Sequence, residues 1–209
     1  MSASEIIITL KEASEKTYKE KGSEFIARAL PVKTEKDVLA FLEEIKKLNY
    51  DASHHCYAFR LKDDSFRYSD AGEPSGTAGI RILNAIDHFG IKDILIIVTR
   101  YFGGTKLGVG PLGKAYYNCS ELVLKDCDTR QERSFIQAII KCDFSFINLV
   151  HRELSNYSAI IENIDYGEVV IFKTLVPPEN ADGLKSALIN NSKGNVDIQA
   201  RNEIIYHFI

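Results

Sequence analysis

The chain has 209 residues, a mass of 23.5 kDa and a formal net charge of −3, with 45% hydrophobic and 26% charged residues. This composition is that of an ordinary globular protein, and the longest apolar run, residues 94–98, is far shorter than a membrane span. The first residues lack the basic and apolar regions of a signal peptide, so we expect a soluble, cytoplasmic protein.

The N-terminal part of the chain alternates short strands with helices of regular apolar spacing. Thr34 and Asp37 predict an N-terminal cap at the start of the first helix. A charged connection without periodicity separates the first two strands. The expected elements are strands at 6–10 and 25–30, a helix at 34–48, a hairpin of 56–61 and 66–69, a helix at 80–89, a buried strand at 94–99 and a helix at 111–124.

Charged residues at 125–133 predict a linker between two domains, 1–134 and 135–209. Beyond the linker the element order is β-α-β-β-α-β, which predicts a ferredoxin-like split βαβ domain. An alternating tail, 204–208, suggests one further strand. The expected elements are a strand at 135–144, a helix around 147–157, a hairpin of 161–165 and 168–176, a helix at 180–190 and a strand at 195–199.

Charge is distributed unevenly: 20 basic and 20 acidic residues precede residue 135, and 6 basic and 9 acidic residues follow. This balance argues against a protein whose whole surface binds nucleic acid and leaves only a local basic patch, because affinity for phosphates comes from basic side chains. The residues proposed for this patch, with Tyr101 and Phe102 available for stacking on bases, are Arg60, Arg67, Arg81, Arg100, Lys106 and Lys114.

No metal or cofactor is expected from the sequence. The four cysteines never approach C-x-x-C spacing and are interpreted as reduced structural thiols. His54 and His55 are adjacent on a strand and point to opposite faces, so they do not readily bind one ion, whereas His54 and Cys56 share a face without further ligands at suitable spacing.

The first glycine-rich loop, residues 69–79, contains three glycines, two carboxylates and three hydroxyls before a helix. Such a loop can bind an anion through backbone amides, or it can be a turn in which Ser75 or Thr77 caps the helix. Asp70 and Glu73 can act as general bases or hard-metal ligands, or be solvated loop charges. We expect Glu73 to accept hydrogen bonds from loop amides and hold the turn.

The second glycine-rich loop follows the buried strand and also precedes a helix. Its residues 108–114 match G-x-x-x-x-G-K formally, but Ala115 replaces the Ser or Thr that a magnesium nucleotide requires, and Pro111 removes an amide donor. We expect binding of a phosphate or carboxylate without catalysis. The predicted ligand- and anion-binding residues are Arg100, Gly103, Gly104, Lys106, Gly108, Gly110 and Lys114.

These motifs together resemble the YigZ/IMPACT family. The resemblance rests on residues 54–58, 69–79, 98–104 and 107–110, with 23–25 similar to the family's opening signature. It covers about residues 15–125 and implies an N-terminal ribosomal-protein-like left-handed βαβ domain, with an α+β fold overall. Residues from 135 onward resemble the ferredoxin-like C-terminal domain of bacterial members. In eukaryotic relatives the N-terminal domain accompanies a regulator of translation.

The leading hypothesis is a non-catalytic, cytoplasmic regulator or binding module linked to translation, with no catalytic residues. Its partner is a protein of the translation machinery or structured RNA, including the ribosome. Two alternatives remain open: a small hydrolase or transferase using Asp70, Glu73 and His54 beside an anion-binding loop, and an RNA-binding module. The sequence leaves the oligomeric state open. The recognition surface is predicted to comprise His54, Asp70, Glu73, Ser75, Thr77, Tyr101 and Phe102.

Overall fold

The computed structural model describes residues 5–209, apart from the side chain of Asn202. Over these residues the fold is mixed α/β, with two five-stranded sheets and five α-helices. It divides into two compact units, Ile7–Gln131 and Glu132–Ile209 together with the described residues before Ile7. No helix within the described part of the chain is long and apolar enough to cross a membrane.

The unit Ile7–Gln131 contains three helices and most of the strands. Its sheet has the order β2-β3-β6-β4-β5, and every neighbouring pair in it is antiparallel. The elements are β1 (Ile6–Leu10), β2 (Ser14–Glu20), β3 (Ser23–Pro31), α1 (Glu35–Leu48), β4 (His54–Arg60), β5 (Phe66–Ser69), α2 (Gly79–Phe89), β6 (Ile94–Tyr101) and α3 (Val109–Asp126).

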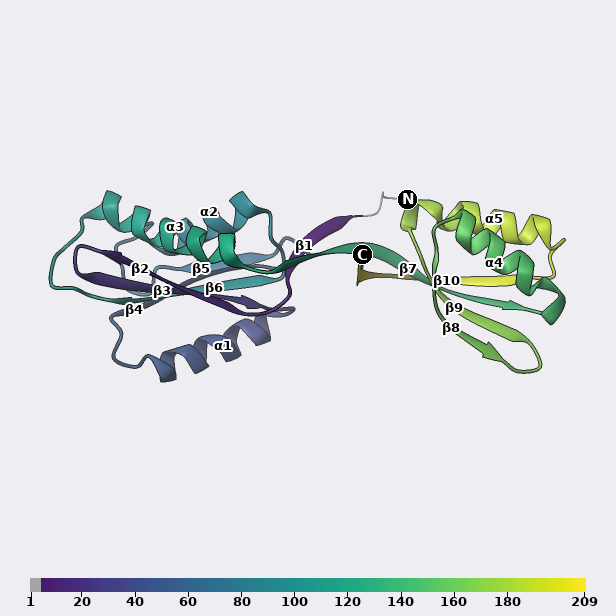
Figure 1. Ribbon diagram of the computed structural model, residues 1–209, viewed down its shortest axis with the longest axis horizontal. Helices are drawn as coiled ribbons and strands as arrows, with labels where there is room; N and C mark the ends of the chain where they lie inside the picture. Colours follow the sequence, from purple (N-terminus) through teal and green to yellow (C-terminus); the bar gives the residue numbers. More distant parts are fainter. Residues whose placement is uncertain (1–4) are drawn as a thin grey trace. The chain divides into compact units, whose positions relative to one another are not determined.

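Helices cover both faces of this sheet: α2 and α3 lie on one face and α1 on the other (Figure 1). The central strand β6 is apolar on both sides, because Ile96 and Val98 belong to the core beneath α2 and α3, whereas Leu95 and Ile97 belong to the core beneath α1. This explains the unbroken β-branched run that predicts a buried strand. The capping box of Thr34 and Asp37 at the start of α1 is also confirmed.

Strand β2 differs from the expectation, which placed residues 14–20 in a charged connection without periodicity. None of its residues is buried, so the apolar alternation that identifies a half-buried strand is absent. The strand forms by pairing with β3 along its whole length, from Ser14 opposite Ala29 to Glu20 opposite Ser23. Tyr18, the only apolar residue of β2, packs against the core beneath α2 and α3.

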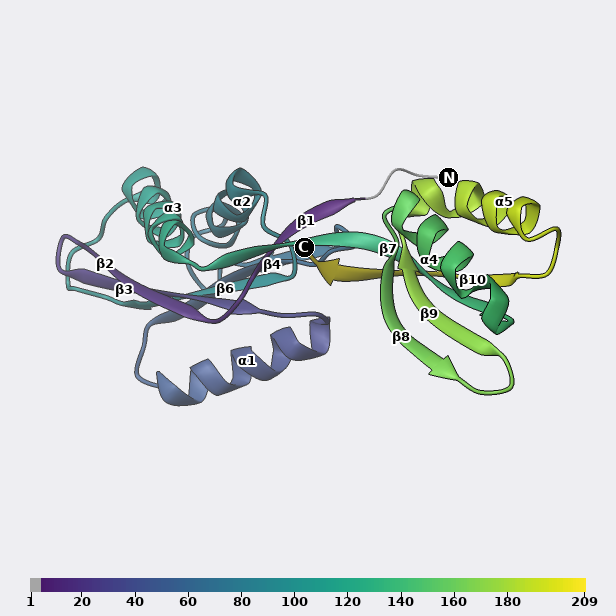
Figure 2. The same ribbon diagram turned by 45° about the vertical axis from the view of Figure 1, so that its right-hand side comes forward.

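The second unit has the β-α-β-β-α-β order of the ferredoxin-like arrangement. Its strand order β10-β7-β9-β8 is antiparallel throughout. Strand β1, whose first residue Ile6 belongs to this unit, is the fifth strand of this sheet. Both helices cover one face of the sheet, as the turned view shows (Figure 2). The elements are β7 (Thr129–Cys142), α4 (Ile147–Asn156), β8 (Ile160–Tyr166), β9 (Val170–Val176), α5 (Ala181–Asn191) and β10 (Asp197–Phe208), with short 3-10 helices at Phe144–Phe146 and Pro178–Asn180.

Two expectations about this region need correction. Residues 125–133 contain the boundary between the two units, at Gln131 and Glu132, but they are not an irregular linker, because α3 continues to Asp126 and β7 begins at Thr129. The tail is not a separate strand either. Strand β10 continues from Asp197 to Phe208 beside β7, with a change of register between Ala200 and Ile204. A bulge of this kind interrupts the alternation from which a single strand is recognised.

Candidate functional site

The register of the first sheet brings His54 and Arg100 together. The two residues are direct partners across β4 and β6, and Phe25 on β3 faces Arg100 from the other side. The Arg100 side chain is only 6% exposed, and its guanidinium carbon lies 5.3 Å from the centre of the Phe25 ring and 5.6 Å from that of Phe102. The sheet therefore holds a charged side chain beneath the two glycine-rich loops.

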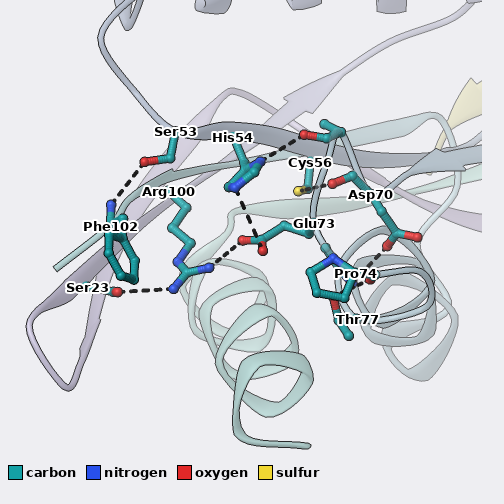
Figure 3. A network of polar contacts seen from close by, with 12 residues as sticks. Ser23, Ser53, His54, Cys56, Asp70, Glu73, Pro74, Thr77, Arg100 and Phe102 are labelled. Carbon is teal, nitrogen blue, oxygen red and sulfur yellow. Dashed lines mark hydrogen bonds and ion pairs between the residues drawn. The ribbon is translucent and has the colours of Figure 1, made fainter. Parts of the chain in front are cut away.

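A buried ion pair neutralises this arginine. Arg100 Nη1 lies 2.6 Å from Glu73 Oε1, and Tyr116 on α3 donates its hydroxyl to the same oxygen over 2.8 Å. Arg100 Nη2 also donates to Ser23 Oγ over 3.3 Å, so the guanidinium lies between the start of β3 and the first loop (Figure 3). Burial, Cys56 and Glu73 all raise the pKa of Tyr116, which keeps its hydroxyl protonated as a donor.

His54 stands at the edge of this network. Its Nδ1 lies 2.9 Å from the carbonyl oxygen of Ala71, and because a carbonyl oxygen only accepts, this nitrogen carries a proton. In the neutral ring the lone pair is then on Nε2, which lies 3.8 Å from Glu73 Oε2. The arrangement fixes the orientation of the ring while leaving Nε2 beyond hydrogen-bond distance of the carboxylate.

Cys56 lies beneath His54 in the same strand but is not suited to nucleophilic catalysis. Burial, with smaller contributions from the charges of Glu73 and Asp70 and against an opposing hydrogen bond with Tyr116, raises the pKa of its thiol to about 12. Its Sγ donates to the carbonyl oxygen of Asp70 over 3.0 Å. Because the thiolate is the reactive form, this thiol remains a structural group.

Asp70, not Glu73, holds the first loop together. Its Oδ1 accepts from the amides of Ala78 and Gly79 over 2.9 and 2.8 Å, and its Oδ2 accepts from Gly76 over 2.9 Å. Burial alone would raise the pKa of Asp70, but these three backbone donors lower it overall. The expectation that Glu73 accepts loop amides was therefore wrong, and neither Ser75 nor Thr77 caps α2, because Asp70 does so from eight residues before the N-cap Ala78.

The second loop packs tightly at one glycine and remains open at another. A Cβ at Gly103 would come within 1.9 Å of the Gly22 carbonyl carbon, so the two turns meet backbone to backbone and only glycine fits. The Gly103 amide donates to Ser23 Oγ over 3.1 Å. Gly108, with a φ of +81°, is the N-cap of α3 and offers no side-chain hydrogen bond. The start of α3 therefore lacks the carboxylate that α2 receives.

The two loops converge on one pocket. It has a volume of about 390 Å³, with Arg100 and Glu73 at its floor and Lys106 exposed at its edge. Several predicted residues meet here with apolar side chains that complete the walls. The lining residues are His54, Glu73, Pro74, Arg100, Phe102, Lys106, Leu107, Gly108, Val109 and Leu112.

Other predicted site residues lie elsewhere. Gly110 and Lys114 line neighbouring hollows beside Asn118, and Gly104 is exposed in the loop. Tyr101 accepts from Asn49 Nδ2 over 3.0 Å. Thr77 is buried, and its hydroxyl donates to the carbonyl oxygen of Pro74, whereas Ser75 is exposed in the loop.

The proposed basic patch is partly neutralised by acidic neighbours. Arg60 pairs with Asp87 over 2.6 Å, and Arg67 pairs with Glu35 over 3.1 Å. Arg81 and Lys114 share a hollow at the start of α3 that is separate from the pocket of Arg100. The six cations are therefore not one continuous surface.

Several residues of the site were not found from the sequence. Tyr116 is fully buried and supplies a hydrogen bond to Glu73 from 43 positions away, with no local motif to mark it. The apolar wall formed by Pro74, Leu107 and Leu112 resembles ordinary core residues at the level of sequence. Ser23 lies in residues 23–25, which resemble the family's opening signature, and this resemblance is the one feature of the sequence that could have identified it as a site residue. Across residues 5–209, no three histidine, cysteine or acidic side chains form a group that could hold a metal ion.

Comparison with known proteins gives a consistent answer over both units. Residues 21–124 match the Impact N-terminal domain, and residues 140–195 match a domain of unknown function, DUF1949. A solved structure described as a hypothetical protein has a TM-score of 0.66 and 26% identity, and the match covers 97% of this chain and 100% of that one.

Curated relatives extend the same match. The IMPACT family member YvyE of Bacillus subtilis is 31% identical over 91% of this chain and 89% of its own length, and YigZ of Escherichia coli is 30% identical over 78% and 82%. Protein IMPACT of Bos taurus is 33% identical over 50% of this chain and 34% of its own. Both units and the residues of both loops thus lead to one assignment: the chain belongs to the IMPACT family.

Proposed function

We propose that this chain is a non-catalytic binding module of the translation machinery, and that the pocket between its two glycine-rich loops is the recognition site. One observation carries the proposal: both loops meet at a single pocket, and the charged groups at its floor are already bound to one another. Oε1 of Glu73 is occupied by Arg100 and Tyr116, and both carboxylate oxygens of Asp70 are occupied by three backbone amides. Such groups support a rigid, preorganised surface rather than proton transfer.

The link to translation rests on the family, whose eukaryotic members include a translation regulator by the resemblance stated above. The pocket supports the binding part of the proposal. It combines apolar walls with a few fixed polar groups and lies at loops held by a rigid sheet, as is typical of ligand sites.

Co-sedimentation with purified ribosomes tests this function. Val109 is 67% exposed at the first position of α3, where an aspartate suits the helix, so Val109→Asp should fold normally while placing a negative charge at the pocket. We expect the wild-type chain to co-sediment with ribosomes and Val109→Asp to lose at least fivefold of that binding. Val169→Asp, at a 40% exposed valine in the other unit, is the matched control and should bind normally.

Two outcomes would contradict this proposal. If the wild-type chain stays in the supernatant at low and physiological salt, the ribosome is not the partner. If Val109→Asp and Val169→Asp reduce binding equally, the pocket is not the recognition site.

A hydrolase or transferase is the second candidate, and the position of His54 favours it. Its Nε2 faces Glu73 within the pocket, where an imidazole of fixed orientation can act as a general base. Asp70 has no place in that mechanism, because both of its oxygens are occupied. Turnover of phosphate or carboxylate esters that is lost in His54→Gln, with an unchanged melting temperature, would favour the enzyme over the binding module.

A further inference from the structure

The floor of the pocket presents a donor and an acceptor that the described part of the protein does not use fully. Arg100 Nε is buried and has no hydrogen-bond partner among the described residues, and the side chain as a whole is only 6% exposed. In Glu73, the partner of Arg100, Oε1 receives two hydrogen bonds, whereas Oε2 has His54 Nε2 at 3.8 Å. A buried donor without a partner is costly, which points to a ligand group that supplies one.

The walls of the pocket suit a flat apolar ring. Phe102 is 48% exposed and lies over the Arg100 guanidinium, so one face of its ring remains available for stacking. Leu107, Val109 and Leu112 line the pocket along the second loop and α3. The volume of about 390 Å³ is near the lower end for small-molecule sites and suits one ring system with a sugar.

The start of α3 adds a place for an anion. Helix N-termini attract negative charge through their free amides and the helix dipole, and this 18-residue helix has no side-chain cap. Lys106 is exposed two residues before the N-cap and lines the same pocket. The negative charge of Glu73 is offset by its pairing with Arg100. An anion at the mouth therefore meets one exposed cation and the start of the helix.

We propose that this pocket binds one nucleotide. Its base stacks on Phe102 and uses a donor and an acceptor on its edge for Glu73 Oε2 and Arg100 Nε, while its phosphate lies at Lys106 and the start of α3. Stacking on aromatic side chains together with hydrogen bonds to the base edge is how proteins hold unpaired nucleotides. The inference rests on the proposed function and names the chemistry that the same site recognises. A free nucleotide and an unpaired nucleotide of RNA share this chemistry.

NMR titration of the 15N-labelled full chain tests the proposal. GMP, AMP, UMP and CMP are added separately, and ribose 5-phosphate and inorganic phosphate serve as probes without a base. We expect at least one nucleotide to shift the amides of Phe102 and of residues 106–110 and to bind at least tenfold more tightly than ribose 5-phosphate. Phe102→Ala should weaken nucleotide binding at least fivefold, and Phe102→Tyr should retain it. Phe144→Ala, at a 56% exposed phenylalanine in the other unit, is the matched control and should leave binding unchanged.

A hexameric single-stranded oligoribonucleotide identifies the source of the nucleotide. Tenfold tighter binding than the mononucleotide at the same amides supports RNA, whereas equal binding supports a free nucleotide. Nucleotide binding no tighter than that of ribose 5-phosphate overturns the base pocket, and so does the absence of shifts with every nucleotide and the oligomer. Ribosome co-sedimentation that depends on Val109 remains measurable in that case, so the failure of this inference differs from the failure of the proposed function.

Discussion

The two helices that follow the glycine-rich loops lie on the same face of one sheet, yet their N-termini are completed differently. Helix α2 receives the Asp70 carboxylate, which accepts from Ala78 and Gly79 at its first turn. Helix α3 begins at Gly108 with no side-chain cap and with Lys106 exposed nearby. The same glycine-rich composition thus produces one terminus satisfied by the protein and one that faces a pocket.

This difference separates structural from binding residues within motifs that look alike. An acidic residue in a loop before a helix suggests catalysis or anion repulsion, but both carboxylate oxygens of Asp70 accept hydrogen bonds from backbone amides of its own loop and of the start of α2. A buried arginine suggests a structural ion pair, and Arg100 forms one while keeping Nε without a partner among the described residues. The groups that can contact a ligand therefore belong mainly to the second loop, whereas the first loop contributes Glu73 to the floor of the pocket.

The largest expected effect comes from breaking the shared floor. Arg100→Met leaves the Glu73 carboxylate buried without its cation, which should lower the free energy of unfolding by about 3–5 kcal/mol. Urea denaturation, followed by NMR amide signals of residues 7–131, measures the loss. The double variant Arg100→Met/Glu73→Gln should regain more than half of it, because no uncompensated charge remains. A loss below about 1 kcal/mol in the single variant would show that the pair is not a structural element.

A smaller loss is expected when the satisfied terminus is broken. Asp70→Asn keeps an acceptor for two amides but turns an amino group toward the amide of Gly76, so it should destabilise the fold by about 1–3 kcal/mol. The matched control is Asp143→Asn, since Asp143 is exposed and makes no capping hydrogen bond. Its effect should stay within about 0.5 kcal/mol. Equal melting temperatures for the two variants would contradict the role assigned to Asp70.

Acid should gradually remove the stabilisation that the Asp70 carboxylate contributes to the fold. Because the pKa of Asp70 is lower in the folded chain than its usual value near 3.9, its stabilisation is fully present above that value and is lost as the pH falls through the folded pKa. The difference in stability between the wild-type chain and Asp70→Asn should therefore be constant from pH 5 to 7 and shrink below about pH 4. Urea midpoints measured at several pH values give this difference, and one that grows on acidification would reverse the sign.

The smallest effect on stability is expected at the open terminus. Lys106 is exposed and belongs to the second loop, so Lys106→Ala should change the free energy of unfolding by less than about 0.5 kcal/mol. Ligand binding should nevertheless weaken, because the pocket loses its exposed cation. Thermal melting and the nucleotide titration, run on the same sample, separate the two effects. A marked loss of stability would show that Lys106 is a structural residue, and that the start of α3, like that of α2, is stabilised by a side chain of the protein.

Much of the fold follows from local patterns in the sequence. The capping box of Thr34 and Asp37 marks the start of α1, and the apolar run of β6 marks a strand buried on both faces. The strand β2 escaped detection because an edge strand with no buried residue has no apolar alternation. The length of β10 escaped it because a change of register interrupts the pattern.

By itself, the sequence determined the family, the α+β class and the concentration of unusual residues in two loops, because these depend on residue types at short spacing. Only the tertiary structure decided which of those residues share a site. Tyr116 reaches Glu73 across 43 positions, and the register of β4 with β6 sets His54 beside Arg100. Hydrogen bonds between distant segments leave no local periodicity in the sequence. The different roles of Asp70, which holds its own loop, and Glu73, which forms the floor of the pocket, are therefore visible only in the assembled sheet.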